Sequence, residues 1–369
     1  MGKRMKTLYL HIGTHKTGST TLQTFLTHNK RTLEAKGIFY PTNGSYFSGC
    51  SQKPLALAIL PAGPGNLQNN AGPPVERYIR EIRQDIQRTS CDKILLSAEH
   101  FSHSITREDV LAIRDLFSPL ISRFKVIVYL RRQDKRIESG YNQMVKTGRV
   151  SCVFEEYVEK VLSDANSHLF YDRLLSLFSD IFGKTNLMVR PFEKSQLNPK
   201  GIISDFLGLL GIDSDSDFRV TDDKNQSLPL ELIEVMRLYG SQLLGIKQRK
   251  LFNQFVTSAA LDIDLTKYTF FSSALRRRVL GFFEESNRYV ARDYLGLENR
   301  GLFLEPTEDG TPRYRGLSAE RLLEISAKIW LIEEDQKAAM KRKIIRLKAR
   351  SSSSSLHRAL ERIARLITK

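Results

Sequence analysis

Leu-His-Ile-Gly-Thr-His-Lys-Thr-Gly-Ser-Thr-Thr-Leu, residues 10–22, is the stretch that decides the fold of this chain. Residues 7–12 form a short, largely apolar run that is typical of a buried strand. Leu22, Phe25 and Leu26 then recur at helical spacing. The glycines, the lysine and the small hydroxyl residues between them predict a loop that points backbone N–H groups at one anion. Such a loop ends at a helix N-terminus, whose dipole favours negative charge.

The loop differs from the Walker A sequence of nucleoside triphosphatases, GxxxxGK[ST], in the place of its lysine. Gly13 and Gly18 have the Walker separation, but Lys16 stands two residues before Gly18 instead of directly after it. A Walker lysine contacts the β- and γ-phosphates, whereas a lysine in this order is expected near the 5′ end of a nucleotide. Taken alone, the segment is equally compatible with a strand–helix turn that binds nothing.

A second segment combines a buried strand with cationic residues. Residues 124–130 are an apolar run, and Arg131 follows them directly, at the end of a strand where open α/β sheets bind ligands. Ser139 lies eight residues further on, about two helical turns along. An arginine fork and a hydroxyl donor suit a second phosphate. The alternative is the solvated start of a basic helix.

Together the two segments resemble the sulfotransferases that use 3′-phosphoadenosine 5′-phosphosulfate (PAPS), most closely the bacterial carbohydrate-sulfotransferase-like group. In that family a K-[ST]-G-[ST]-T loop holds the 5′-phosphosulfate, and an arginine with a serine eight residues later holds the 3′-phosphate. The resemblance covers roughly residues 7–305, and Gln133 departs from it where the family often has proline. It implies donor contacts from Lys16, Thr17, Gly18, Ser19, Thr20, Thr21, Arg131 and Ser139.

Sulfuryl transfer needs charge stabilisation on the leaving oxygen and a base for the acceptor hydroxyl. Lys16 is the expected electrostatic partner of the bridging oxygen. For the base, the strand at 93–97 delivers Glu99 and His100 to the rim of the predicted site. The resemblance implies a functional residue at this strand end, and we take Glu99 as the first choice and His100 as the second. The alternative is that Glu99 caps a helix and His100 packs.

The order of elements predicts a doubly covered parallel sheet. Strand candidates at 7–12, 93–97, 124–130 and 186–189 are separated by segments with helical patterns. We therefore predict a three-layer, P-loop-like α/β domain over residues 1–318. A basic helical tail is predicted over 319–369. The proline-rich stretch 41–75 is expected to be a long loop with a short helix at 54–60.

The tail carries much of the net charge of +16. Residues 337–369 hold 11 Lys or Arg and one acid, which leaves +6 for the rest of the chain. Five serines at 351–355 predict a flexible hinge. Residues 356–369 show an apolar and a basic stripe at helical period, as in helices that rest on anionic membranes. A helix that packs on the body or on a partner is the alternative.

The resulting functional hypothesis is a PAPS-dependent sulfotransferase acting on a hydroxyl acceptor, which the resemblance implies to be a glycan or glycolipid. We expect PAPS as co-substrate, no metal, no nucleic-acid partner and possible peripheral contact with anionic membrane. Three scattered cysteines and no apolar run near 18 residues favour a cytoplasmic protein. The rivals are a P-loop nucleotide kinase or NTPase, and a basic membrane-surface or nucleic-acid adaptor.

Overall fold

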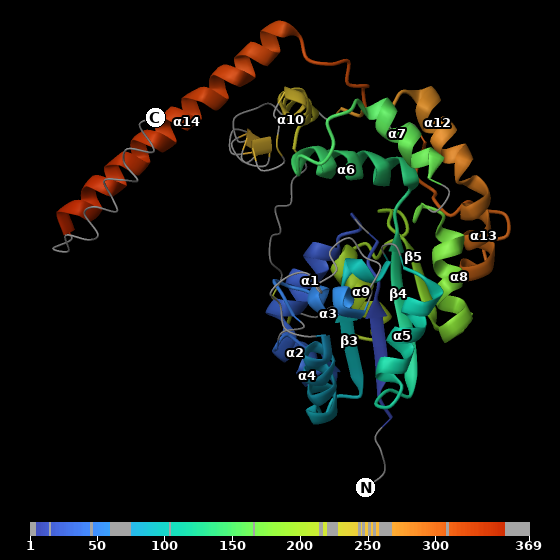
Figure 1. Ribbon diagram of the computed structural model, residues 1–369. Coiled ribbons are helices and arrows are strands. Elements are labelled where there is room, and N and C mark those ends of the chain that lie inside the picture. The colour runs from blue at the N-terminus through green and yellow to red at the C-terminus, as the bar shows by residue number, and fades with distance from the viewer. Residues whose placement is uncertain are drawn as a thin grey trace. The chain divides into compact units, whose positions relative to one another are not determined.

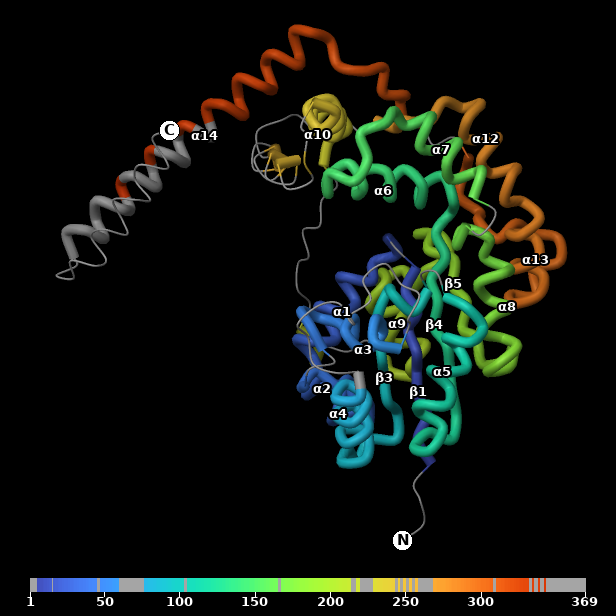
Figure 2. Tube along the Cα trace, viewed as in Figure 1, coloured from blue at the N-terminus to red at the C-terminus, as the bar shows by residue number. Residues whose placement is uncertain are grey.

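The computed structural model describes residues 5–14, 16–44, 47–59, 75–102, 105–164, 167–213, 217–219, 228–242, 268–307 and 310–350, with a few positions between 245 and 257. The chain divides into two compact units, and each is described by itself (Figures 1 and 2). The first unit comprises Met1–Gly140, Val158–Asn225 and Ser273–Asp309, and the second comprises Tyr141–Tyr157, Gln226–Ser272 and Gly310–Lys369.

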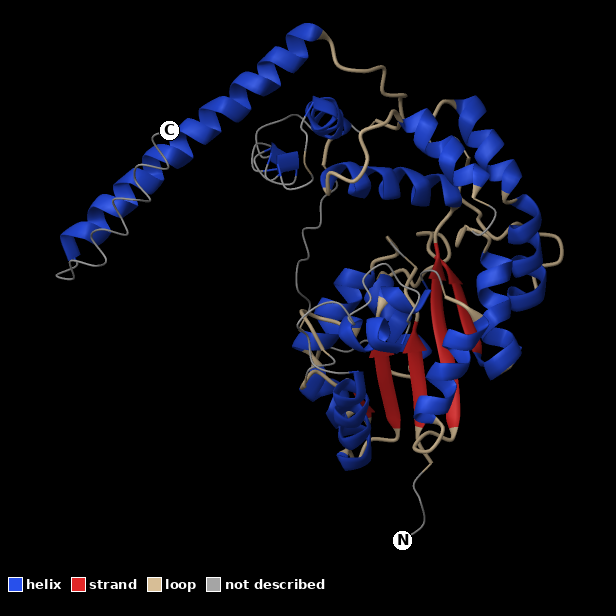
Figure 3. Ribbon diagram, viewed as in Figure 1, coloured by secondary structure: helices blue, strands red, loops and turns tan. Residues whose placement is uncertain are grey.

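A five-stranded parallel sheet is the centre of the first unit (Figure 3). Its order is β2-β3-β1-β4-β5. The strands are β1 (Thr7–His11), β2 (Ile38–Phe39), β3 (Lys93–Ser97), β4 (Arg123–Leu130) and β5 (Leu187–Pro191). The four strands expected from the sequence are confirmed. Strand β2 was not predicted, because two residues carry no periodic signal.

Side chains alternate between the two faces of the sheet, and each face has its own apolar core. Leu8, Leu10 and Val128 belong to one cluster, and Leu95, Ile127 and Tyr129 belong to the other. The helices on the first face are α3 (Lys53–Ile59), α4 (Val75–Arg88), α5 (Arg107–Phe117), α8 (Tyr171–Phe182) and α13 (Glu284–Leu295). Those on the second are α1 (Ser19–His28), α2 (Lys30–Ala35) and α9 (Ile202–Leu209). The predicted three-layer α/β architecture is therefore confirmed.

The remaining helices complete the first unit or straddle the units in sequence. Two short 3₁₀ turns, η2 and η3, and helix α12 lie in the first unit. Helices α6 and α7 each include residues of both units. The bounds are η2 (Glu99–Ser102), η3 (Lys184–Asn186), α6 (Gln133–Lys146), α7 (Phe154–Ser163) and α12 (Ser273–Phe282).

The second unit contains α10 (Leu230–Gln242) and the long helix α14 (Ala319–Arg350). Its core includes a stack of Phe154 on Phe270, with ring centroids 5.3 Å apart. The helix predicted to begin at Ala319 is confirmed by α14, and the helix expected at 54–60 by α3. The serine hinge and the amphipathic segment 356–369 lie outside the described residues, and the division at residue 318 stays a prediction.

Candidate functional site

The loop after β1 holds two residues in the left-handed backbone region. Gly18, the N-cap of α1, has φ 75°, and Lys16 has φ 69°. Gly13 is required for a different reason, since a Cβ there would lie 2.7 Å from Ser19 Oγ and 3.3 Å from His11 Cε1. The loop is therefore closely packed at Gly13, and a larger residue at this position would push Ser19 and His11 away. His15 lies outside the described residues.

The buried hydroxyl groups of the loop bond to backbone carbonyl oxygens and so stabilise the shape of the loop. Thr14 Oγ1 donates to the Tyr129 carbonyl oxygen at 2.6 Å, and Thr17 Oγ1 donates to the Thr14 carbonyl oxygen at 2.6 Å. Ser19 is also buried, whereas Thr20 is exposed and Thr21 is half-buried. The N-cap residue of α1 is Gly18, which has no side chain to cap the first turn. The groups that Thr17 and Ser19 can offer an anion are thus backbone N–H donors at a helix N-terminus.

Arg131 joins the two predicted phosphate segments. It follows β4 directly, and its guanidinium Nη1 donates to the carbonyl oxygen of Lys16 at 2.8 Å. Strands β1 and β4 are adjacent and parallel, so their carboxyl ends bring residues 115 positions apart to one place. Burial and the neighbouring Arg136 lower the pKa of Arg131 from its usual value. The side chain is still a cation at neutral pH, because the usual pKa of arginine is so high.

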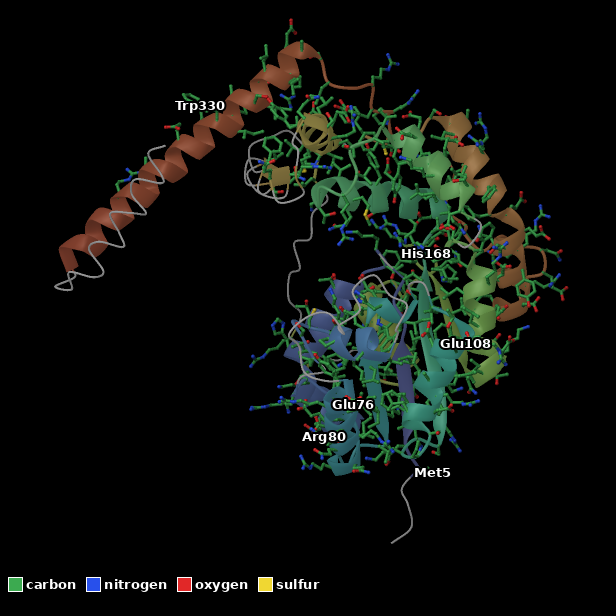
Figure 4. All side chains as sticks on the ribbon, in the orientation of Figure 1. Met5, Glu76, Arg80, Glu108, His168 and Trp330 are labelled. Carbon is green, nitrogen blue, oxygen red and sulfur yellow. The ribbon has the colours of Figure 1, made fainter. Side chains whose placement is uncertain are left out.

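A further cationic group lies beside Arg131. Arg136 is nearly buried, and its Nη2 lies 3.0 Å from Nε2 of His168, which Figure 4 labels. Tyr171 is fully buried and donates its hydroxyl to the Arg131 carbonyl oxygen, fixing the turn after β4. Ser139 is half-buried on α6, the helix that starts two residues after Arg131. The sequence had not indicated the Arg136–His168 pair.

Glu99 and His100 lie in η2, directly after β3, and both are half-buried. Ser102 in the same turn donates its hydroxyl to two carbonyl oxygens, those of Gly13 at 3.1 Å and Glu99 at 3.0 Å. The backbone N–H of Ala98 donates to the His11 carbonyl oxygen at 3.2 Å, which extends the β1–β3 pairing. The turn that carries both candidate bases is therefore tied to the loop after β1.

Beneath the loop, His11 forms a buried polar network with two neighbours. Its Nδ1 lies 2.8 Å from Ser97 Oγ, and Gln23 Nε2 donates to the same hydroxyl at 3.1 Å. Phe206 packs edge-on against the imidazole ring at 5.2 Å. Burial lowers the pKa of His11 to about 4, although the negative charge of Glu99 acts in the opposite direction. His11 is therefore neutral near pH 7, and it is close enough to Glu99 for an electrostatic interaction between the two side chains.

Arg190 and Gln133 both hold parts of the protein together. Arg190 binds the buried Asp205 carboxylate through Nη2 at 2.6 Å and Nε at 3.2 Å, and Tyr129 donates to the same carboxylate. Gln133, which departs from the family pattern, exchanges amide bonds of 2.8 and 3.1 Å with Asn287 on α13.

A separate polar cavity of about 650 Å³ lies between α12, α13 and the segment 298–307. Arg132, Arg288, Arg300 and Glu305 are among its lining residues, and Lys16, Arg131 and Ser139 are not. Within the described ranges, no group of three or more His, Cys, Asp or Glu side chains is arranged to hold a metal ion. The same part of the chain contains no helix long and apolar enough to cross a membrane.

Comparison with known proteins gives limited likeness. No known protein-family profile matches the chain. An uncharacterized protein of Archaeoglobus fulgidus is 29% identical over 214 residues, which are 58% of this chain and 56% of that protein. The match thus spans little more than half the length of that relative. The crystal structure of a sulfotransferase from Alicyclobacillus acidocaldarius is 16% identical, with a TM-score of 0.39, over 66% of this chain and 93% of that chain.

Proposed function

We propose that the first unit is a sulfotransferase that moves a sulfuryl group from PAPS to a hydroxyl acceptor. The observation that carries this proposal is the contact between Arg131 and the Lys16 carbonyl oxygen. It joins an uncapped helix N-terminus, suited to one anionic group, to a cation suited to a second. A nucleotide with phosphate groups at both its 5′ and 3′ positions presents two such anions. The family pattern in residues 16–20, 131 and 139 supports the same donor.

The chemistry assigned to the loop is stabilisation of charge on the leaving group. The S–O bond to the 5′-phosphate breaks, a new S–O bond forms to the acceptor oxygen, and adenosine 3′,5′-bisphosphate leaves. Negative charge develops on the bridging oxygen as its bond to sulfur breaks. The Lys16 ammonium and the N–H groups of the first turn of α1 are the groups that meet this charge. Arg131 and Ser139 would hold the 3′-phosphate.

Glu99 is assigned as the base that takes the acceptor hydroxyl proton. The bonds from Ser102 to the carbonyl oxygens of Gly13 and Glu99 support this role, because they link the turn to the loop that is proposed to hold the donor. His100, one residue further, is the second candidate. A glutamate serves as a base near neutral pH when its pKa is raised toward the working pH.

The acceptor is proposed to be a hydroxyl of a glycan or glycolipid, on the family resemblance. The basic residues of segment 356–369 would then hold the enzyme weakly at an anionic membrane surface, at about 1 kcal/mol for each basic side chain near the surface. Removal of residues 351–369 is expected to leave activity on a soluble acceptor unchanged and to reduce salt-sensitive binding to anionic vesicles.

The direct test of the donor site is calorimetry with adenosine 3′,5′-bisphosphate and adenosine 5′-monophosphate. Arg131→Ala should weaken binding of the bisphosphate by about 1.5–3 kcal/mol, since a charge-assisted fork is lost from a partly desolvated anion. Binding of the monophosphate should change much less. Arg123→Ala, at the opposite end of β4, is the matched control and should change neither.

Equal losses for both nucleotides would remove Arg131 from the 3′-phosphate site. Transfer of labelled sulfate to a hydroxyl acceptor, read by mass spectrometry, tests the reaction itself. Turnover of a nucleoside triphosphate that depends on magnesium would favour the kinase or NTPase instead.

A further inference from the structure

Helix α14 carries an exposed apolar face that the proposed reaction does not use. Leu323, Trp330 and Leu331 are 70%, 60% and 56% exposed. They follow one another at i, i+7 and i+8, so they share one side of the helix. Ile325, on a different side, is fully buried. Trp330, labelled in Figure 4, is the single tryptophan of the chain.

The start of α14 is attached to α10. Arg321 binds both carboxylate oxygens of Glu231 at 3.1 and 3.0 Å, and Tyr239 Oη lies 3.1 Å from Ser326 Oγ. Residues 327–350 continue the helix past these contacts for about 36 Å at 1.5 Å per residue. In proteins, most of the stability of a helix comes from packing of its apolar face and not from helix propensity, so an exposed apolar face on so long a helix indicates a packing partner.

The charge of α14 changes sign along its length. Residues 319–335 contain five acidic and two basic residues, with Glu333, Glu334 and Asp335 in succession. Residues 336–350 contain seven basic residues and no acidic one. Two parallel copies would set acid against acid and base against base, whereas two antiparallel copies set each half against its opposite.

We propose that α14 pairs antiparallel with α14 of a second copy of this chain, crossing at Ala338. In this register, each member of the acidic run 333–335 lies opposite one of the basic run 341–343, and Leu331 lies opposite Ile345. Trp330 and Arg346 occupy facing positions of the two helices in this register. The alanine at the crossing lets the two backbones approach closely. The paired segment is 327–350, which leaves the start of the helix free to keep its contacts with α10.

A membrane surface fits this face less well than a second copy does. An anionic surface would attract residues 336–350 but repel the acidic run 333–335, which lies only three to five residues after Trp330. The basic segment 356–369 would be repelled by residues 336–350 if it folded back along them. The fluorescence experiment below separates the second of these occupants, residues 356–369, from a second copy.

The experiment is a charge swap on the full-length protein, read by light scattering during size-exclusion chromatography. Variant A reverses the acids with Glu333→Lys, Glu334→Lys and Asp335→Lys. Variant B reverses the bases with Lys341→Glu, Arg342→Glu and Lys343→Glu. The proposal requires a wild-type dimer, monomers for A and for B alone, and a restored dimer for the chain that carries all six changes.

Mixtures determine the direction of pairing. In antiparallel pairs the six-fold variant repels the wild type, so a mixture should contain the two homodimers and no mixed species. A parallel pair would give the reverse, because opposite charges would then meet only in the mixed dimer. Mixed dimers therefore overturn the antiparallel arrangement. A wild-type chain that is monomeric at high micromolar concentration overturns the proposal itself.

Trp330→Ala and Leu323→Ala test the extent of the paired face. Trp330→Ala should weaken the dimer about 30-fold, as truncation of a central aromatic side chain does in other interfaces. Leu323→Ala removes a side chain that is at least as exposed but lies outside residues 327–350, and it should leave the dimer unchanged. Equal effects of the two changes contradict the register.

Wild-type fluorescence gives a readout that needs no variant. Trp330 emission should shift to longer wavelength on dilution as the dimer dissociates. The alternative outcome is an emission maximum that does not change on dilution but moves to longer wavelength when residues 351–369 are removed. It would show that this segment covers the face, and it would overturn the dimer.

Discussion

The ends of β1 and β4 are built in opposite ways, although they are adjacent in the sheet. After β1, hydroxyl side chains bond to backbone carbonyl oxygens of the loop and of β4, and the groups proposed to meet a ligand are N–H donors and the Lys16 side chain. After β4, the backbone is fixed by Tyr171, and the groups proposed to meet a ligand are the side chains of Arg131 and Ser139. Side-chain changes should therefore alter shape on the β1 side and affinity on the β4 side.

The largest expected effect lies at neither strand end but in the turn after β3 that is bonded to the loop. Glu99→Gln keeps the size of the side chain and removes the base, which should lower kcat by about 10²–10⁴-fold. Donor binding should be retained, as measured by calorimetry with adenosine 3′,5′-bisphosphate. His100→Ala should have the smaller effect. Two fully active variants would place the base elsewhere in the molecule.

Lys16→Ala tests the chemical role proposed for the Lys16 side chain. The other ligand groups proposed in this loop are backbone N–H donors. We expect kcat to fall by about 10²–10³-fold and donor affinity to fall by less than tenfold, because charge on the bridging oxygen develops in the transition state. Steady-state kinetics beside direct binding separates the two quantities. Lys16→Arg is the control that keeps the positive charge, and it should recover part of the rate. Normal turnover of the alanine variant would remove Lys16 from the mechanism.

His11 should make the β1 side sensitive to acid. Its folded pKa of about 4 lies below the ordinary value near 6.5, so between these pH values the unfolded chain binds a proton that the folded chain does not. The free energy of unfolding should therefore fall as pH decreases through this window, by roughly 3 kcal/mol at its lower end. Urea unfolding of wild type and His11→Gln at pH 7 and pH 4.5 measures it. The same pH dependence in both proteins would assign the loss to other groups.

The smallest expected effects separate the two sides most directly. Ser139→Ala should cost about 1 kcal/mol of affinity for adenosine 3′,5′-bisphosphate and leave the free energy of unfolding nearly unchanged. Thr17→Val removes a buried bond to the Thr14 carbonyl oxygen and should cost about 1–2 kcal/mol of unfolding free energy. Isothermal calorimetry and urea titration on both variants make the comparison. An affinity loss at Thr17 without a stability loss would show that its hydroxyl contacts the ligand.

Sequence patterns predicted the features that depend on residues close together in the chain. The buried runs at 93–97 and 124–130 identify their strands, and parallel pairing then brings Arg131 to the loop. Contacts between distant side chains had no such signal. The amides of Gln133 and Asn287 are 154 residues apart, and the bond from Ser102 to Gly13 spans 89. The pairing of Arg190 with Asp205 was equally open, because an arginine after a strand is compatible with a ligand or with a carboxylate of the same protein.

The position of β1 in the sheet determines when the site can form. The strand that starts at Thr7 lies between two neighbours, and its partners Lys93 and Arg123 come 86 and 116 residues later. Contacts of such large sequence separation slow folding, since the intervening chain must be closed into a loop first. When the loop after β1 has just emerged from the ribosome, the nascent chain therefore has no sheet to hold this loop in place. A nucleotide bound as proposed would stabilise the fold only after β4 has emerged, so the loop after β1 would become functional only once a strand more than 100 residues later has been synthesised.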